Sequence, residues 1–156
     1  MWGVLIAVLL AMAGLGPAAA QAARTWLFDD SSDLVTLQYG TPESDDVVIA
    51  MSCEANTRTI RINEFASSSS LTPGRTAKLK LTNGPASLEY NGQALANEMD
   101  GGVNLEVVVP PDPKLFALLK GGPSLTIDVA GAQATVPMKA AAPYIAPLEK
   151  ACLSKR

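Results

Sequence analysis

Apolar and polar residues alternate one by one over much of this chain. A period of two turns successive side chains alternately toward a core and toward water, which is typical of strands in an antiparallel sheet. Besides the runs that alternate clearly, residues 26–28 and 34–39 are two further candidate strands, so we expect eight or nine strands in all. Strands that recur about every 8–12 residues favour a sandwich or a barrel over a parallel sheet. The clearest alternating runs are residues 47–53, 59–63, 77–81, 103–109, 125–129 and 133–138.

Two dipeptides interrupt the alternation at places where a hairpin turn is expected. Asn91-Gly92 separates residues 88–90 from residues 93–95, and both residue types tolerate the positive φ that a two-residue turn requires. Ala130-Gly131 stands in the same way between the last two alternating runs. The sequence therefore predicts a hairpin turn at each dipeptide.

Two other segments have helical patterns. Asp112 can cap a helix that begins at Pro113, and Gly121-Gly122 ends it, which predicts a short crossover helix. A second helix is predicted over about residues 146–153, because prolines at 143 and 147 are tolerated only near a helix start. Its apolar stripe consists of Ile145, Leu148, Ala151 and Cys152.

These elements together define the expected fold class. It is all-β and mainly antiparallel, a β-sandwich or flattened barrel of about nine strands with a short crossover helix and a C-terminal helix. The chain has 156 residues, which fits a single β-rich domain over residues 21–156 after the leader described next.

The first 20 residues carry no charged side chain and read as an export signal. An apolar run over residues 2–10 is followed by glycine, proline and small residues, with Ala18-x-Ala20 and Ala20-x-Ala22 as cleavage sites. The alternative is an uncleaved membrane anchor, since about 20 apolar residues can span a bilayer. No basic residue flanks the run, so we predict a signal peptide over residues 1–20. A periplasmic or secreted location follows.

The expected location determines the oxidation state of the two cysteines, Cys53 and Cys152. In an oxidising compartment a cysteine pair normally forms a disulfide. Their separation of 99 residues argues against a redox motif, which needs the two thiols close together. In the chain-entropy model, closing a loop this long stabilises a fold by about 4–5 kcal/mol. We predict a structural disulfide.

Composition excludes several functions. The net charge of −3 and the sequence pI of about 4.9 argue against nucleic-acid binding, which requires a basic face. The chain has no histidine, which rules out a Ser-His-Asp or Cys-His catalytic group and removes the commonest zinc ligand. We expect no cofactor.

The acidic residues of the N-terminal part are candidate calcium ligands. Asp29, Ser31 and Asp33 have the spacing that opens a calcium loop, and Glu43, Asp45 and Asp46 follow with no basic residue between. However, Leu34 replaces the glycine of the sharp turn and no glutamate stands at the twelfth position. Aspartate and serine are also ordinary turn residues. No metal site is predicted.

Catalytic candidates are equally unspecific, and we predict no catalytic residue. A serine nucleophile lacks a G-x-S-x-G elbow or an S-x-x-K lysine, with Ser52 inside a strand and residues 67–70 in a loop. Arg75, Lys78 and Lys80 form at most a small basic stripe, typical of edge protection or of a solvated strand face. Nothing in the spacing of the possible acid–base carboxylates singles out a pair; these are Glu64, Glu89, Glu98, Asp100 and Glu106.

The last third of the chain resembles a known family. The helix end at Lys120, Gly121 and Gly122, an alternating strand over residues 125–129, the Gly131 turn and a strand ending in Pro137-Met138 precede an alanine-rich helix. This order resembles small exported proteins of Gram-negative bacteria grouped with the invasion-associated locus B family. The resemblance implies a leader, a β-sandwich-like body and a non-catalytic role in the envelope. It carries over no catalytic residue.

The expected function is therefore a non-catalytic periplasmic or secreted binding protein of the bacterial envelope. Its partner would be another envelope or host protein, with no nucleic acid and no membrane span after leader cleavage; the binding residues are unknown. One alternative is a small envelope hydrolase with paired carboxylates, which needs converging acids in a pocket. Another is an inhibitor of an envelope-targeting hydrolase, presenting the loop of residues 67–74.

Overall fold

The computed structural model describes residues 22–54, 57, 59–98 and 101–153. These residues form nine strands in one antiparallel sheet of order β1-β2-β3-β4-β7-β6-β5-β8-β9, which confirms the predicted all-β class and strand number. The predicted signal peptide falls outside the described residues and stays a prediction. The strands are β1 (Thr25–Asp29), β2 (Leu34–Gly40), β3 (Val47–Glu54), β4 (Thr59–Glu64), β5 (Thr76–Asn83), β6 (Ala86–Ala96), β7 (Val103–Val109), β8 (Ser124–Val129) and β9 (Ala132–Pro137).

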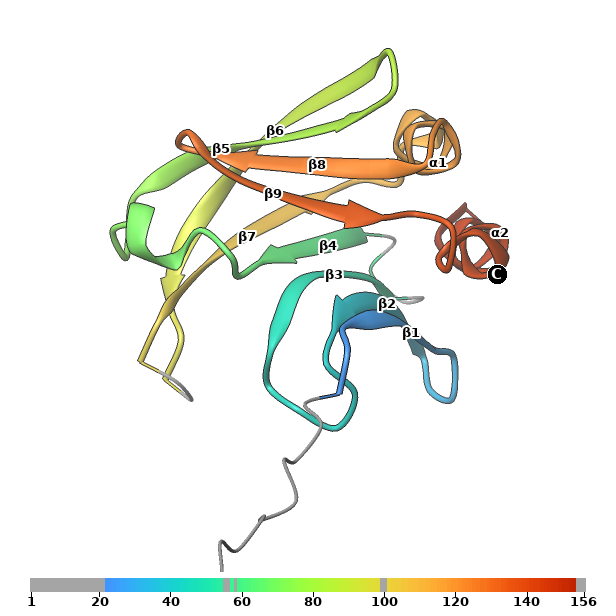
Figure 1. The fold of residues 1–156 in the computed structure, drawn as a ribbon, viewed down its shortest axis with the longest axis horizontal. Coiled ribbons are helices and arrows are strands. Elements are labelled where there is room, and N and C mark those ends of the chain that lie inside the picture. The colour runs from blue at the N-terminus through green and yellow to red at the C-terminus, as the bar shows by residue number, and fades with distance from the viewer. Residues whose placement is uncertain (1–21, 55–56, 58, 99–100, 154–156) are drawn as a thin grey trace, which may run out of the picture.

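The sheet curls into an open barrel around one core (Figure 1). β1 to β4 form one side, β5, β8 and β9 form the other, and the two helices lie together at one end. Strand β6 makes the bend because it changes partner along its length. Gln93 faces Thr76 of β5 on one side and Glu106 of β7 on the other. Residues before Gln93 pair with β5, and residues after it pair with β7.

This bend corrects one sequence prediction. Asn91-Gly92 is not a hairpin turn but lies inside β6, and the turn is at Gly84-Pro85, where Gly84 has φ +59°. Gly92 is required for a different reason. A Cβ there would lie 2.8 Å from the carbonyl oxygen of Glu106 and 2.8 Å from Cγ2 of Val107. The missing side chain lets β6 approach β7 closely at the bend. In the sequence alone, a glycine needed for such an approach cannot be distinguished from a glycine of a turn dipeptide.

The second predicted hairpin turn is present. Ala130 and Gly131 have φ of 53° and 85°, and they join β8 to β9 with Val129 opposite Ala132. Two central residues with positive φ are what a tight hairpin requires.

The crossover helix α1 (Pro113–Lys120) begins and ends as predicted. The Oδ1 of Asp112 accepts a hydrogen bond of 2.9 Å from the backbone N–H of Lys114, and Gly121 follows the last turn. The buried face of α1 contacts the core between the two sides of the sheet. Its residues are Leu115, Phe116, Leu118 and Leu119.

Helix α2 (Ala142–Leu153) begins four residues earlier than the predicted start at residue 146. Pro143 lies in the first turn, where a backbone N–H has no partner within the helix. Pro147 lies further in and removes one hydrogen bond, but both rings point to solvent and the helix continues past them. The predicted stripe is buried at Ile145, Leu148 and Cys152.

A disulfide joins Cys53 of β3 to Cys152 of α2, with a Cα–Cα distance of 5.3 Å. It fixes the C-terminal helix to β3, one residue before that strand ends at Glu54, and both cysteines belong to the buried core. No helix among the described residues is long and apolar enough to cross a bilayer.

Candidate functional site

The acidic residues of the N-terminal part do not come together. Asp29 and Asp33 flank the turn before β2, whereas Glu43, Asp45 and Asp46 lie in the turn after it, at the other end of the strand. Within the described residues, no three acidic or cysteine side chains converge in a way that could hold a metal ion.

Each of these turns uses its aspartate internally. Asp29 Oδ1 accepts hydrogen bonds from the N–H (2.9 Å) and Oγ–H (2.6 Å) of Ser31, which lower the pKa of Asp29. Asp46 binds the guanidinium of Arg24 with both oxygens (2.7 and 2.9 Å) and accepts a bond from Thr41. These bonds, that from Arg24 first, lower the pKa of Asp46 to about 2. Both carboxylates are turn-stabilising groups.

The candidate acid–base carboxylates are also separated. Glu64 is fully buried, and its Oε1 accepts hydrogen bonds from the N–H (3.0 Å) and Oγ–H (3.1 Å) of Ser67. Glu106 lies opposite Asn63 on the outer face, so Glu64 points to the other side of the sheet. Glu106 forms an ion pair with Arg61, and Glu89 forms one with Lys78. Glu98 is exposed, and Asp100 lies outside the described residues.

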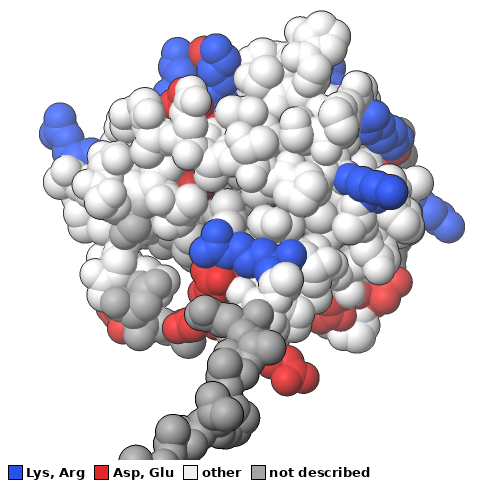
Figure 2. Space-filling view, in the orientation of Figure 1, with Lys and Arg blue, Asp and Glu red and all other residues white. Residues whose placement is uncertain are grey.

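The basic residues of β5 are balanced by acids. Lys80 stands between Glu89 of β6 and Asp128 of β8 in the strand register, and Lys78 lies 2.9 Å from the Glu89 carboxylate. Figure 2 shows basic and acidic side chains together at the top of the visible face, while other acidic side chains gather along its lower part. The basic stripe is therefore a neutralised strand face and not edge protection, because β5 lies between β6 and β8. Ser52, 9% exposed, is packed in the outer face of β3.

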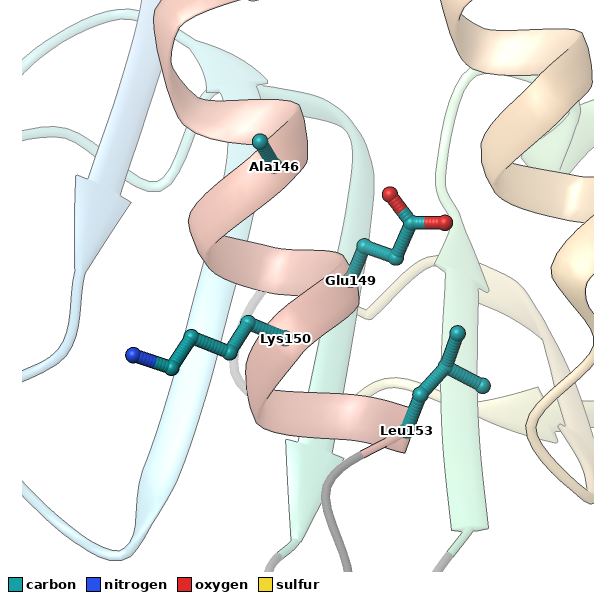
Figure 3. Close-up of a pocket in the computed structure, with 4 residues that line it drawn as sticks. All are labelled: Ala146, Glu149, Lys150 and Leu153. Atoms are coloured by element: carbon teal, nitrogen blue, oxygen red, sulfur yellow. The ribbon is translucent and has the colours of Figure 1, made fainter.

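Two shallow hollows border the C-terminal half of α2. One, of about 330 Å³, is lined by Ala146, Glu149, Lys150 and Leu153 (Figure 3). Lys150 points to one side of the helix, whereas Glu149 and Leu153 point to the other, and Glu149 forms an ion pair with Lys120. The second, of about 320 Å³, is lined by Pro110, Pro111, Cys152 and Leu153. Their walls offer no converging polar groups, so neither hollow has the character of a ligand site.

The two ends of the strand order, β1 and β9, are the edges of the sheet. They meet at one point, where Trp26 Nε1 donates a hydrogen bond of 2.6 Å to the carbonyl oxygen of Pro137. The Trp26 ring is 4% exposed and packs against Tyr39 at a centroid distance of 5.4 Å. This contact holds the open barrel together at its seam.

The register fixes which backbone groups of β9 face outward. Val129 and Ala132 close the two-residue turn and exchange both of their hydrogen bonds, so Ala134 and Val136 also bond to β8. The bond from Met138 N–H to Pro123 O continues this alternation. Gln133, Thr135 and Pro137 therefore direct their backbone groups away from β8.

Two residues of β9, Gln133 and Thr135, each direct both an N–H and a C=O away from β8. Pro137 has no N–H, and its carbonyl accepts the bond from Trp26. Gln133 and Thr135 each present one N–H and one C=O on the side where β9 has no strand neighbour in the described part of the chain. Both side chains are exposed.

The edge also carries no charge from Ala130 to Pro137, and the area over β8 and β9 is largely uncharged in Figure 2. Edge strands are usually protected from pairing by charged side chains. The β1 edge has that protection, since Arg24 precedes it and Asp29 ends it. The outward groups of Gln133 and Thr135 are thus the candidate site, and sequence analysis missed them.

A search among solved structures finds a likeness of fold to the crystal structure of invasion associated protein B from Bartonella henselae. The TM-score is 0.49 and the identity is 15%, over 81% of this chain and 96% of that chain. It is the same kind of protein as the one that the last third of the sequence resembles. At this identity and TM-score, nothing about the activity or partner of this chain follows from the likeness. No protein-family model matches the sequence, and no curated protein matches it.

Proposed function

We propose that this chain is a non-catalytic binding protein of the bacterial envelope, periplasmic or secreted, which binds through the exposed edge of β9. The observation that carries the proposal is the pair of outward N–H and C=O sets at Gln133 and Thr135 on an uncharged edge. Such an edge pairs with an extended polypeptide, because the second strand supplies a carbonyl for each N–H and an N–H for each carbonyl.

Export is supported by the apolar first 20 residues and by the disulfide. Disulfides persist in the periplasm and outside the cell, and thiols remain reduced in the cytosol. Fractionation of cells that express the whole sequence, with mass spectrometry of the N-terminus, tests this part. We expect polypeptide that begins at residue 21 or 23 in the envelope fraction. Unprocessed chain in the cytosol with two titratable thiols would refute export.

The absence of catalysis is supported by the placement of the candidate acids. A hydrolase with paired carboxylates needs two of them across a cleft. Here Glu64 is buried, and Glu89 and Glu106 are occupied by ion pairs on the outer face. The inhibitor stays an alternative: Ser67 is buried and Leu71 packs on the core, whereas Thr72, Pro73 and Gly74 of the same loop are exposed.

Binding through β9 is tested with a photo-crosslinking amino acid at position 133, in cells that express the full chain. We expect a discrete adduct from position 133 and none from position 80, which lies on the outer face two strands away. The adduct should disappear when Thr135→Pro is added, because proline removes the outward N–H at residue 135. An adduct that survives this change would exclude the edge as the binding surface.

A further inference from the structure

The outward groups of β9 are arranged so that the strand can pair with itself. A second copy in antiparallel orientation, turned about a two-fold axis at Ala134, sets Gln133 opposite Thr135 of the second copy. The reverse pair forms at the same time. Each pair exchanges two hydrogen bonds, so the two copies would share four. No outward backbone group of Gln133 or Thr135 would remain unpaired.

The side chains of the strand fit this register. Residues on the axis form the closely spaced type of pair, with Cα atoms about 4.5 Å apart, and alanine is small enough for it. The pairing stops short of Pro137, whose outward carbonyl already accepts the hydrogen bond from Trp26 of its own copy.

The charges nearest the edge favour the antiparallel orientation. Asp128 lies at the turn end of β9, where its carboxylate accepts bonds from Gly131 N–H and from the Gln133 side chain. Lys139 is exposed two residues beyond the other end. Antiparallel pairing brings Lys139 of each copy toward Asp128 of the other. A parallel arrangement would set like charges side by side, at a cost in free energy.

From these observations we propose that the binding partner of the β9 edge is a second copy of this chain, paired antiparallel about Ala134. The proposal rests on the proposed function, since it names the occupant of the same edge. The product is a two-fold symmetric dimer whose sheet continues from one copy into the other.

Sedimentation equilibrium of the purified, disulfide-bonded protein tests the proposal, with Thr135→Pro compared to Thr135→Ala. We expect wild type and Thr135→Ala to form dimers. Thr135→Pro removes two of the four hydrogen bonds, which weakens the dimer by at least about thirtyfold at ~1 kcal/mol per bond. The variant should keep the fold, because the N–H that proline removes at position 135 points away from β8 and makes no hydrogen bond within the sheet. Position 137, which has the same orientation, is already a proline. Circular dichroism and melting check this.

A cysteine at the axis tests the register. Ala134→Cys should give a covalent dimer on mild oxidation, because the two positions face each other. Ala132→Cys is the matched control and should not, because it faces Val136 of the second copy. A monomeric wild type, a dimer unaffected by Thr135→Pro, or equal cross-linking at both positions would overturn the proposal.

The failure of this inference can be separated from failure of the proposed function. If the purified protein is monomeric and position 133 gives a Thr135→Pro-sensitive adduct with the mass of a different protein, the edge binds another partner and only the self-pairing is wrong. If position 133 gives no adduct at all, both proposals fail.

Discussion

The side-chain amide of Asn83 donates a hydrogen bond of 3.0 Å to the carbonyl oxygen of Leu118, and so joins the β5–β6 turn to the last turn of α1. Asn83 is fully buried, and its Nδ2 also reaches the carbonyl of Leu119 at 3.4 Å. Carbonyls of the last helical turn have no partner within the helix, so this amide acts as a cap supplied from the sheet. The contact fixes the helical end of the barrel against one side of the sheet.

Asn83→Ala should therefore lower the free energy of unfolding by about 1–3 kcal/mol, because it removes both hydrogen bonds that this buried amide donates, to the carbonyls of Leu118 and Leu119. Urea denaturation measures the change. Thr82→Ala is a control one residue away, since the Thr82 side chain makes an exposed hydrogen bond with Ser87, and should change stability by less than about 0.5 kcal/mol. Equal effects of the two substitutions would refute the capping role.

Glu64 predicts an unusual pH dependence. Burial raises the pKa of Glu64, although the hydrogen bonds from Ser67 oppose the shift. A carboxyl whose pKa is raised on folding favours the folded state most below the unfolded pKa, and this contribution is lost as pH rises through the folded pKa. Glu64→Gln keeps an acceptor for Ser67 and cannot ionise. We expect it to melt at a higher temperature than wild type at pH 7, with the difference shrinking toward pH 4.

Thermal melting across this pH range decides the point. A Glu64→Gln variant that is less stable than wild type by the same amount at every pH would contradict it. Glu98→Gln, which changes an exposed acid, should leave the melting curves unaltered.

The Cys53–Cys152 bond should be the largest single covalent contribution to stability. We expect Cys152→Ser to lower the free energy of unfolding by about 4–5 kcal/mol, the chain-entropy value for a loop of this length. Asp30→Ala, at an exposed turn position, serves as the comparison and should stay within about 0.5 kcal/mol of wild type. Thiol titration of the denatured, unreduced wild type should detect no thiol, and a Cys152→Ser loss below about 1 kcal/mol would argue against the bond as a clamp.

Substitutions at Gly92 and Asn91 test whether this dipeptide lies in a bend of β6 or in a hairpin turn. Gly92→Ala should cost about 1–3 kcal/mol, because its Cβ would press on the Glu106 carbonyl, which is backbone and cannot move aside. Asn91→Ala should be nearly neutral in this structure, since Asn91 is exposed and has no positive φ. In a hairpin turn both changes would be costly. Chemical denaturation of the two variants settles which geometry holds.

Much of the fold could be predicted from sequence because most strands bury one face. The alternation at Ile60 and Ile62, or at Leu125 and Ile127, reports that burial directly. The cap at Asp112 likewise involves a neighbour only two residues away. Features of this kind depend on residues that are close together in the sequence, so they can be predicted without knowing the order of strands in the sheet.

The candidate site could not be predicted in this way. The order β4-β7-β6-β5-β8 is not sequential, so no local pattern reveals that β9 ends the sheet while β8 lies inside it. Gly92 was misread because close approach to Glu106, distant in sequence, determines its role. Glu64 resembles any strand-end acid until the burial of its side chain is known.

The Cys53–Cys152 bond closes a covalent ring that contains β4 to β9 and α1, with β1 and β2 outside it. One cut by a protease anywhere in that ring releases no fragment, because both pieces stay attached through the two sulfur atoms. Loss of the chain after such a cut requires a reductant as well, so in an oxidising compartment a nicked molecule remains a single covalent unit.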